Sequence, residues 1–326
     1  MRKKLTLFAV CLASVVVVLG AFTRLTDAGL GCPDWPGCYG FLAVPSTEAA
    51  IAEAEAAYPH APVEAHKAWA EMVHRYFATT LGFVIVVLAV LFVRARRESH
   101  REPFRLPLFL LALVILQGAF GAWTVTLKLW PQVVTAHLLG GFTTLSLLWL
   151  LYLRQSDGLG GRWTVPHSAG TLALVLLVVV FVQIALGGWV SSNYAALACP
   201  DFPTCHGLWL PPTDFHEGFN VFQDVGPNYL GGQMENDARV TIQWVHRLGA
   251  LTVFVLGTVL CLRLYRAGSR FAGVLALALA TQITLGILNV VLTLPLTIAT
   301  LHNAGGALVL LVMVTVNYRA FRARRA

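Results

Sequence analysis

Charged residues are scarce in this chain, since only 12% of its 326 residues are Asp, Glu, Lys or Arg. Soluble domains carry about 25% charged residues. Hydrophobic residues make up 57% of the sequence, and its mean hydropathy is +0.70. This composition excludes a soluble fold. In a soluble protein the net charge of +7 would point to an acidic partner, but here we expect the basic residues to orient the chain in a membrane, and we predict no nucleic-acid partner.

Apolar stretches without charge recur eight times, and each is about as long as the 20 residues that cross a bilayer. They lie near Leu5–Thr23, Tyr76–Val93, Leu106–Leu127, Pro131–Leu153, Ser168–Ser191, Val240–Leu262, Phe271–Thr293 and Leu294–Asn317. No A-x-A cleavage site follows the first stretch before Arg24, so we expect a retained helix and not a signal peptide. The sequence therefore predicts an all-α integral membrane protein with eight transmembrane helices.

Most of the 23 Lys and Arg residues fall on one side of these predicted helices. They are Arg2, Lys3, Lys4, Arg94, Arg96, Arg97, Arg101, Arg105, Arg154, Arg162, Arg263, Arg266, Arg270, Arg319, Arg322, Arg324 and Arg325. The positive-inside rule places this side and both termini in the cytoplasm. The two long loops, about Arg24–Ala70 and Ser192–Arg239, are then extracytoplasmic. Within the first loop, the Ala- and Glu-rich segment Thr47–Pro59 is predicted as a surface helix.

Four of the six cysteines lie in these two loops. They are Cys32 and Cys38 in the first loop, and Cys199 and Cys205 in the second. An oxidising compartment favours disulfides, and we expect each pair to be joined within its own loop. Each disulfide is either a structural link or a pair that cycles between redox states. Cys11 and Cys261 fall inside helices and are interpreted as small buried residues.

An internal repeat organises the chain. The strings CPDWPGC (Cys32–Cys38) and CPDFPTC (Cys199–Cys205) share one pattern. The same spacing relates Gln117, Gly121, His137, Gly140 and Gly141 to Gln282, Gly286, His302, Gly305 and Gly306, and relates His74-Arg75 to His246-Arg247. Because an even number of spans separates equivalent helices, the repeats are parallel. We predict two four-helix bundles related by a pseudo-twofold axis, with residues 1–160 forming one and residues 161–326 the other.

Four of the ten histidines share one predicted depth in the membrane. His74, His137, His246 and His302 each lie within a turn or two of the outer end of an even-numbered span, and the second span is expected to begin around Glu71. Ionisable groups inside a bilayer are rare and mark function. A single such histidine is often a hydrogen-bonded core residue, but paired imidazoles across a bundle hold haem iron. Zinc is disfavoured because its ligands cluster at short spacing.

Two further residue types stand beside these histidines. Arg75 and Arg247 would either bind haem propionates or extend to lipid headgroups. Glu71 lies three residues before His74 and shares its helix face, whereas Gln243 occupies the equivalent position in the second half. A carboxylate there can take or give protons, and the alternative is that Glu71 only caps the start of its helix. We predict that Glu71 is catalytic.

Together these motifs resemble the haem A synthase family of bacteria and mitochondria. The resemblance rests on GLGCPDWPGC (Gly29–Cys38), EMVHR (Glu71–Arg75), TAHLLGG (Thr135–Gly141), VHRLGA (Val245–Ala250) and LHNAGGA (Leu301–Ala307), and it spans essentially the whole chain. The insertion around Thr47–Pro59 departs from the shortest members. The resemblance implies that the C8 methyl of haem O is oxidised to the formyl group of haem A by successive two-electron oxidations.

The resemblance also implies roles for individual residues. His74 and His137 would flank the substrate haem in the amino-terminal half, with Glu71 assisting the chemistry, while His246 and His302 would ligate a permanent haem b. The implied location is a bacterial inner membrane. The implied partners are a haem O synthase, the cytochrome oxidase assembly machinery and an unidentified electron donor, and a homo-oligomer is compatible with the sequence. Two other functional classes would use parts of the same pattern: a di-haem b-type electron carrier and a membrane thiol oxidoreductase.

Overall fold

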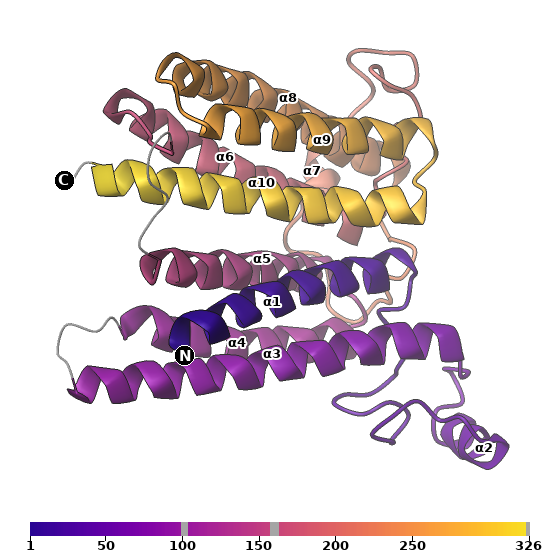
Figure 1. Cartoon of the computed structure of the whole chain (residues 1–326). Helices are drawn as coiled ribbons and strands as arrows, with labels where there is room; N and C mark the ends of the chain where they lie inside the picture. The colour runs from indigo at the N-terminus through magenta and orange to yellow at the C-terminus, as the bar shows by residue number, and fades with distance from the viewer. Residues whose placement is uncertain (99–103, 157–162, 324–326) are drawn as a thin grey trace. The chain divides into compact units, whose positions relative to one another are not determined.

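A computed structural model describes residues 1–98, 104–156 and 163–323 of the chain (Figure 1). Its elements are α1 (Arg2–Leu25), α2 (Glu48–Ala57), α3 (Ala65–Glu98), α4 (Arg105–Thr126), α5 (Pro131–Arg154), the 3-10 turn η1 (His167–Ala169), α6 (Gly170–Ser192), α7 (Phe215–Gly218), α8 (Asn236–Arg266), α9 (Phe271–Val291) and α10 (Leu296–Ala323). Among the residues used to orient the chain, Arg101, Arg162, Arg324 and Arg325 lie outside the described residues, as does the predicted boundary at residue 160.

Eight of these helices are long and apolar enough to cross a membrane: α1, α3, α4, α5, α6, α8, α9 and α10. They coincide with the eight predicted stretches, so the prediction of an all-α membrane protein is confirmed. Helices satisfy their own backbone hydrogen bonds, which is why such stretches fold this way in lipid. The pseudo-twofold relation between the halves stays a prediction.

Two helices begin earlier than their apolar runs indicate. Helix α3 begins at Ala65, and not around Glu71, and α8 begins at Asn236. The added turns carry polar residues such as Lys67 and Asp237. Water solvates these side chains, and the helical backbone hydrogen bonds continue through the turns. Hydropathy detects the apolar part of a helix and misses such extensions. His74 and His246 therefore lie further from their helix starts than the predicted turn or two.

The described residues divide into two compact units. One contains Met1–Leu145 with Val221–Gln233, and in it α3 packs against α1 and α4. A stretch of the second long loop belongs to this unit, since Trp130 Nε1 donates to Gln223 O (3.1 Å) and Tyr229 N donates to Lys128 O (3.0 Å). The other unit contains Ser146–Asn220 with Met234–Ala326, and in it α6, α8, α9 and α10 pack in a closed ring of contacts.

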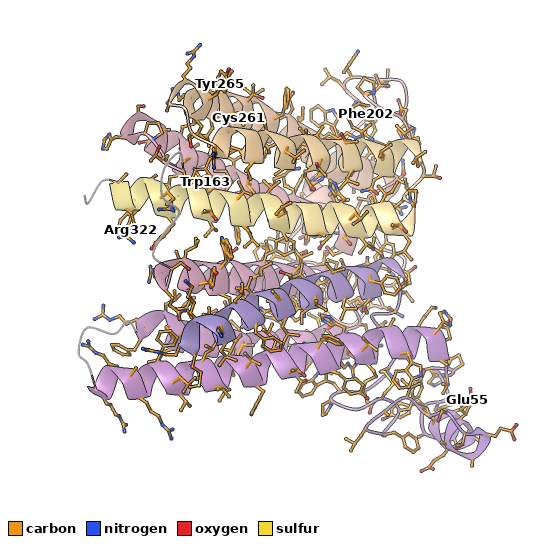
Figure 2. All side chains as sticks on the ribbon, viewed as in Figure 1. Glu55, Trp163, Phe202, Cys261, Tyr265 and Arg322 are labelled. Carbon is orange, nitrogen blue, oxygen red and sulfur yellow. A yellow bond between two sulfur atoms is a disulfide. The ribbon has the colours of Figure 1, made fainter. Side chains whose placement is uncertain are left out.

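The surface helix predicted over Thr47–Pro59 is confirmed as α2. The Thr47 hydroxyl accepts a hydrogen bond from Ala50 N (3.2 Å) and caps its start, while Glu55 is exposed at its outer side (Figure 2). The loop around it packs on Tyr39, which donates to Pro62 O (2.9 Å) and meets the ring of Tyr58 edge to face. Burial raises the pKa of Tyr39, so its hydroxyl stays a donor at neutral pH.

The two cysteines inside helices differ from the prediction. Cys11 is exposed on α1, and Cys261 is half-buried on α8 (Figure 2). The prediction of burial is wrong for Cys11. In a membrane helix an apolar side chain needs no protein neighbour, because lipid solvates it as well as a core does.

Candidate functional site

Both cysteine loops fold in the same way. Each closes with a disulfide, Cys32–Cys38 in one and Cys199–Cys205 in the other, so the predicted disulfides are confirmed. The Asp of each CPD motif then holds two backbone N–H groups beyond the second cysteine. Asp34 accepts from Tyr39 (2.6 Å) and Gly40 (2.9 Å), and Asp201 accepts from His206 (2.6 Å) and Gly207 (2.9 Å). Sequence reasoning missed this role, although the Asp is repeated in both motifs.

These aspartates fix turns that the backbone otherwise disfavours. Tyr39 and His206 have φ values of 56° and 53°, and Gly40 and Gly207 have φ values of 81° and 75°, in the left-handed region that costs non-glycine residues energy. A hydrogen bond from the Thr204 hydroxyl, with those from the backbone amides, lowers the pKa of Asp201 to about 2. Its carboxylate is thus charged throughout the physiological range.

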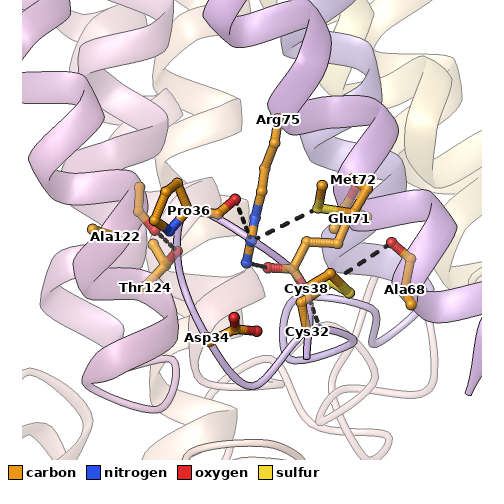
Figure 3. Close-up of polar contacts among 12 residues, drawn as sticks. Cys32, Asp34, Pro36, Cys38, Ala68, Glu71, Met72, Arg75, Ala122 and Thr124 are labelled. Carbon is orange, nitrogen blue, oxygen red and sulfur yellow. Dashed lines mark hydrogen bonds and ion pairs between the residues drawn. A yellow bond between two sulfur atoms is a disulfide. The ribbon is translucent and has the colours of Figure 1, made fainter. Parts of the chain in front are cut away.

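Glu71 faces the first of these loops (Figure 3). Its side chain is buried, with 5% of the residue exposed. Its carboxylate accepts a hydrogen bond from Cys32 N (2.9 Å) and forms an ion pair with Arg75 one turn along α3. Arg75 in turn donates to Gly37 O and Pro36 O in the loop. Because α3 begins at Ala65, Glu71 lies beyond the first turn and is not a cap of that helix.

The second half has the arginine contacts without the carboxylate. Arg247 donates to Thr204 O (2.6 Å) and Cys199 O (2.8 Å), so it fastens its disulfide loop to α8 as Arg75 fastens the first to α3. Gln243 is 6% exposed, and its Oε1 atom has no hydrogen-bond partner among the described residues. The arginines therefore have loop contacts that sequence reasoning missed. Their contact with propionates stays a prediction.

The four histidines lie in pairs, one pair in each unit. His137 lies within electrostatic reach of His74, and His246 within reach of His302. The Nδ1 atoms of His74, His137 and His302 are buried and, in the described part of the chain, have no hydrogen-bond partner. The Nδ1 of His246 lies 3.1 Å from Gln183 Nε2. Polar ring nitrogens are rarely left this way without a ligand.

A glycine on the preceding long helix faces the Cε1 atom of each ring. A Cβ atom there would lie between 3.0 and 3.6 Å from Cε1 for the pairs Gly20 and His74, Gly121 and His137, Gly187 and His246, and Gly286 and His302. The described residues contain no cluster of three or more His, Cys, Asp or Glu suited to a metal ion. Paired imidazoles with close-packed backbone fit a haem, because the porphyrin supplies the remaining ligands of the iron.

Comparison with known proteins identifies the family of this chain. Residues 3–314 match the model of the COX15-CtaA family, described as cytochrome oxidase assembly protein. A haem A synthase of Shewanella oneidensis is 46% identical over 307 residues, which cover 93% of this chain and 92% of that protein. The chain belongs to the haem A synthase family. This confirms the family predicted from the motifs.

More distant relatives have the same description. A haem A synthase of a Chelativorans species is 32% identical, over 97% of this chain and 88% of that protein. Another from Beijerinckia indica is 33% identical, over 92% of this chain and 87% of that protein. In each comparison the match covers nearly the whole length of both proteins.

Proposed function

We propose that this haem A synthase converts haem O to haem A in its amino-terminal half and keeps a permanent haem b in its carboxy-terminal half. The observation that carries the proposal is an asymmetry within a repeat. Both halves have two buried imidazoles, a disulfide loop and an arginine that fastens it, but among the described residues a carboxylate stands three residues before the first of these histidines only in the first half, at Glu71.

In this proposal His74 and His137 would hold the substrate haem, and His246 and His302 would hold haem b. Haem b, when bound, would supply a one-electron carrier. Neutral imidazoles are the form that binds iron, and the apolar helices around them keep water and stray protons away. The glycines that face the rings let the preceding helices approach closely, which leaves each imidazole little freedom to turn.

Glu71 is the residue to which we assign proton transfer. Oxidation of a methyl group to a formyl group releases protons, and a group that can change protonation state must receive them. The Glu71 carboxylate is held by Cys32 N and by Arg75, so its direction is fixed before the substrate arrives. Gln243 offers an amide that cannot titrate. This difference supports the first half as the reactive one.

We also propose the orientation given by the basic residues, with both termini in the cytoplasm and the disulfide loops outside a bacterial inner membrane. Most of the described basic residues support this, because they lie at the start of α1 and α4 and near the ends of α3, α5, α8 and α10. A haem O synthase would supply the substrate, the cytochrome oxidase assembly machinery would receive the product, and an unidentified redox partner would exchange electrons with the protein.

Extraction of the purified protein with acid and acetone, followed by mass spectrometry, tests the proposal. Haem b together with haem O, haem A or a hydroxylated intermediate is expected. Haem b alone would indicate an electron carrier without substrate chemistry, and a protein without haem would indicate a thiol oxidoreductase. Expression with and without a haem O synthase provides the matched control, because only the first condition supplies substrate.

A further inference from the structure

The structure contains a finer repeat than the two halves. In three of the four helix pairs that carry a histidine, a glutamine lies one turn before the glycine that faces the ring, and a second glycine lies three residues after the histidine. The sets are Gln117, His137 and Gly140 on α4 and α5; Gln183, His246 and Gly249 on α6 and α8; and Gln282, His302 and Gly305 on α9 and α10.

The second glycine makes room for the glutamine. A Cβ atom on Gly140 would overlap the amide of Gln117, and a Cβ atom on Gly249 would overlap the amide of Gln183. Gly305 stands in the same relation to Gln282. The glycine after each of these histidines therefore serves a packing purpose, which is to seat an amide from the neighbouring helix beside the imidazole.

Two of the three amides lie within hydrogen-bonding distance of their imidazoles. Gln183 Nε2 is 2.9 Å from His246 O and 3.1 Å from His246 Nδ1. Gln282 Nε2 is 3.5 Å from His302 Nε2. The Oε1 atoms of Gln183 and Gln282 are buried and, within the described ranges, accept no hydrogen bond. An imidazole that binds iron through one nitrogen presents an N–H from the other, and rotation of the amide brings Oε1 into position to accept it.

The first helix pair breaks this pattern. Val16 on α1 occupies the glutamine position, and Phe77 on α3 occupies the position of the second glycine. The backbone at the glutamine position faces the ring in α1 as it does in α9, so the pairs differ in the side chain and not in the path of the helix. His74 is therefore the histidine of the four whose preceding long helix carries no glutamine one turn before the glycine that faces the ring.

We propose that these glutamines are positioning residues that hold imidazoles on iron, and that their absence beside His74 makes His74 the ligand that releases. A permanent haem needs two fixed ligands, and the second half has a glutamine for each. A substrate haem must enter and its product must leave, and the first half has a glutamine only for His137. This inference rests on the proposed assignment of the two halves.

The first test replaces Gln183 by Leu in the full-length protein. Loss of a group that hydrogen-bonds a metal ligand changes affinity by about 10- to 100-fold, so transfer of haem b to a haem-free globin should become faster by about that factor. Gln155→Leu, one residue past the end of α5, is the matched control, and its rate should equal that of the wild type. If Gln183→Leu does not fold, Gln282→Leu tests the same role at the other axial ligand.

The midpoint potential of haem b separates positioning from simple packing. Gln183→Leu removes an acceptor from the ligand and should raise the potential, whereas Gln183→Glu provides a stronger acceptor and should lower it. Shifts of both variants in one direction, or wild-type haem transfer in Gln183→Leu, would overturn the role proposed for glutamine.

The reverse experiment installs the missing residues. The variant Val16→Gln with Phe77→Gly should retain haem O or haem A about 10-fold longer than wild type during dilution into haem-free globin, while its haem b is released at the wild-type rate. Unchanged retention would overturn the assignment of His74 as the releasing ligand. Wild-type protein that holds haem b but never haem O or haem A would instead contradict the proposed function.

Discussion

Replacement of Glu71 by Gln separates the two tasks that its carboxylate can perform. Gln is nearly the same size and can still accept the hydrogen bond from Cys32 N, which is 2.9 Å long in the structure. It cannot form the ion pair with Arg75, and it cannot carry a proton. We expect haem A formation to fall by about 10²-fold or more, the effect of losing a general acid or base, and haem O to accumulate in the protein.

The structural cost of this change should be small in comparison. The side chains of Arg75 and Glu71 are 12% and 6% exposed, and removal of one partner of a buried pair costs about 3–5 kcal/mol when the other charge is left alone. Arg75 keeps Gly37 O and Pro36 O as acceptors. The loss of folding free energy should therefore lie nearer the value for one hydrogen bond to a charged group, about 1.5–3 kcal/mol. Haem b content should therefore stay at the wild-type level.

Two further variants make the experiment decisive. Arg75→Gln breaks the same ion pair and loosens the loop but keeps the carboxylate, so it should reduce haem A formation less than Glu71→Gln does. Glu64→Gln removes an exposed carboxylate that pairs with Lys67, and it should have no effect. The assay is the ratio of haem A to haem O after extraction, measured by mass spectrometry with haem b as internal standard. Near wild-type haem A formation by Glu71→Gln would refute the catalytic role.

The remaining predictions concern the second half and the loops. His246→Ala or His302→Ala should remove most of the b-type absorbance because each supplies one axial bond, and a normal bis-histidine spectrum in both would contradict the assignment. Thr47→Ala should destabilise α2 by about 1 kcal/mol and speed its proteolysis without changing haem content. The pKa of Asp201 is lowered to about 2 in the folded loop, whereas an unfolded Asp has a pKa of about 3.9. The ionised carboxylate therefore stabilises the second loop fully at pH values above about 3.9, and this stabilisation is lost as the pH falls towards 2. Asp201→Asn should abolish that pH dependence of loop proteolysis.

The elements that sequence could predict are those fixed by local composition. A bilayer requires about 20 apolar residues and internally satisfied backbone, so the eight helices follow from hydropathy, and α2 follows from the Ala- and Glu-rich composition of Thr47–Pro59. Hydropathy does not predict the starts of α3 and α8, because it does not distinguish polar helical turns in water from loops. The association of Val221–Gln233 with the first unit depends on single backbone contacts such as Tyr229 N to Lys128 O, which no pattern in the sequence signals.

The candidate site divides in the same way. Repetition of the histidines indicates their pairing from sequence alone, because duplicated helices place equivalent residues at one depth. The hydrogen bond from Cys32 N to Glu71 joins the first disulfide loop to α3, and these segments are distant in the sequence, so only the tertiary structure reveals it. The glutamine repeat was visible in part, at Gln117 and Gln282, but its meaning required the seat that Gly140 provides.

The two halves together show which features of the first site serve architecture and which do not. In both, an aspartate shapes the loop and an arginine on the following long helix binds loop carbonyls, through Arg75 in one and Arg247 in the other. The second loop is held in this way although Gln243 stands where Glu71 would be, and the Gln243 Oε1 atom is left without a partner among the described residues. Holding the loop therefore does not require the carboxylate. Glu71 therefore adds to the first half a charged group that a proton can neutralise, and loop packing does not explain why it is there. The proposed reaction, which releases protons, does explain it.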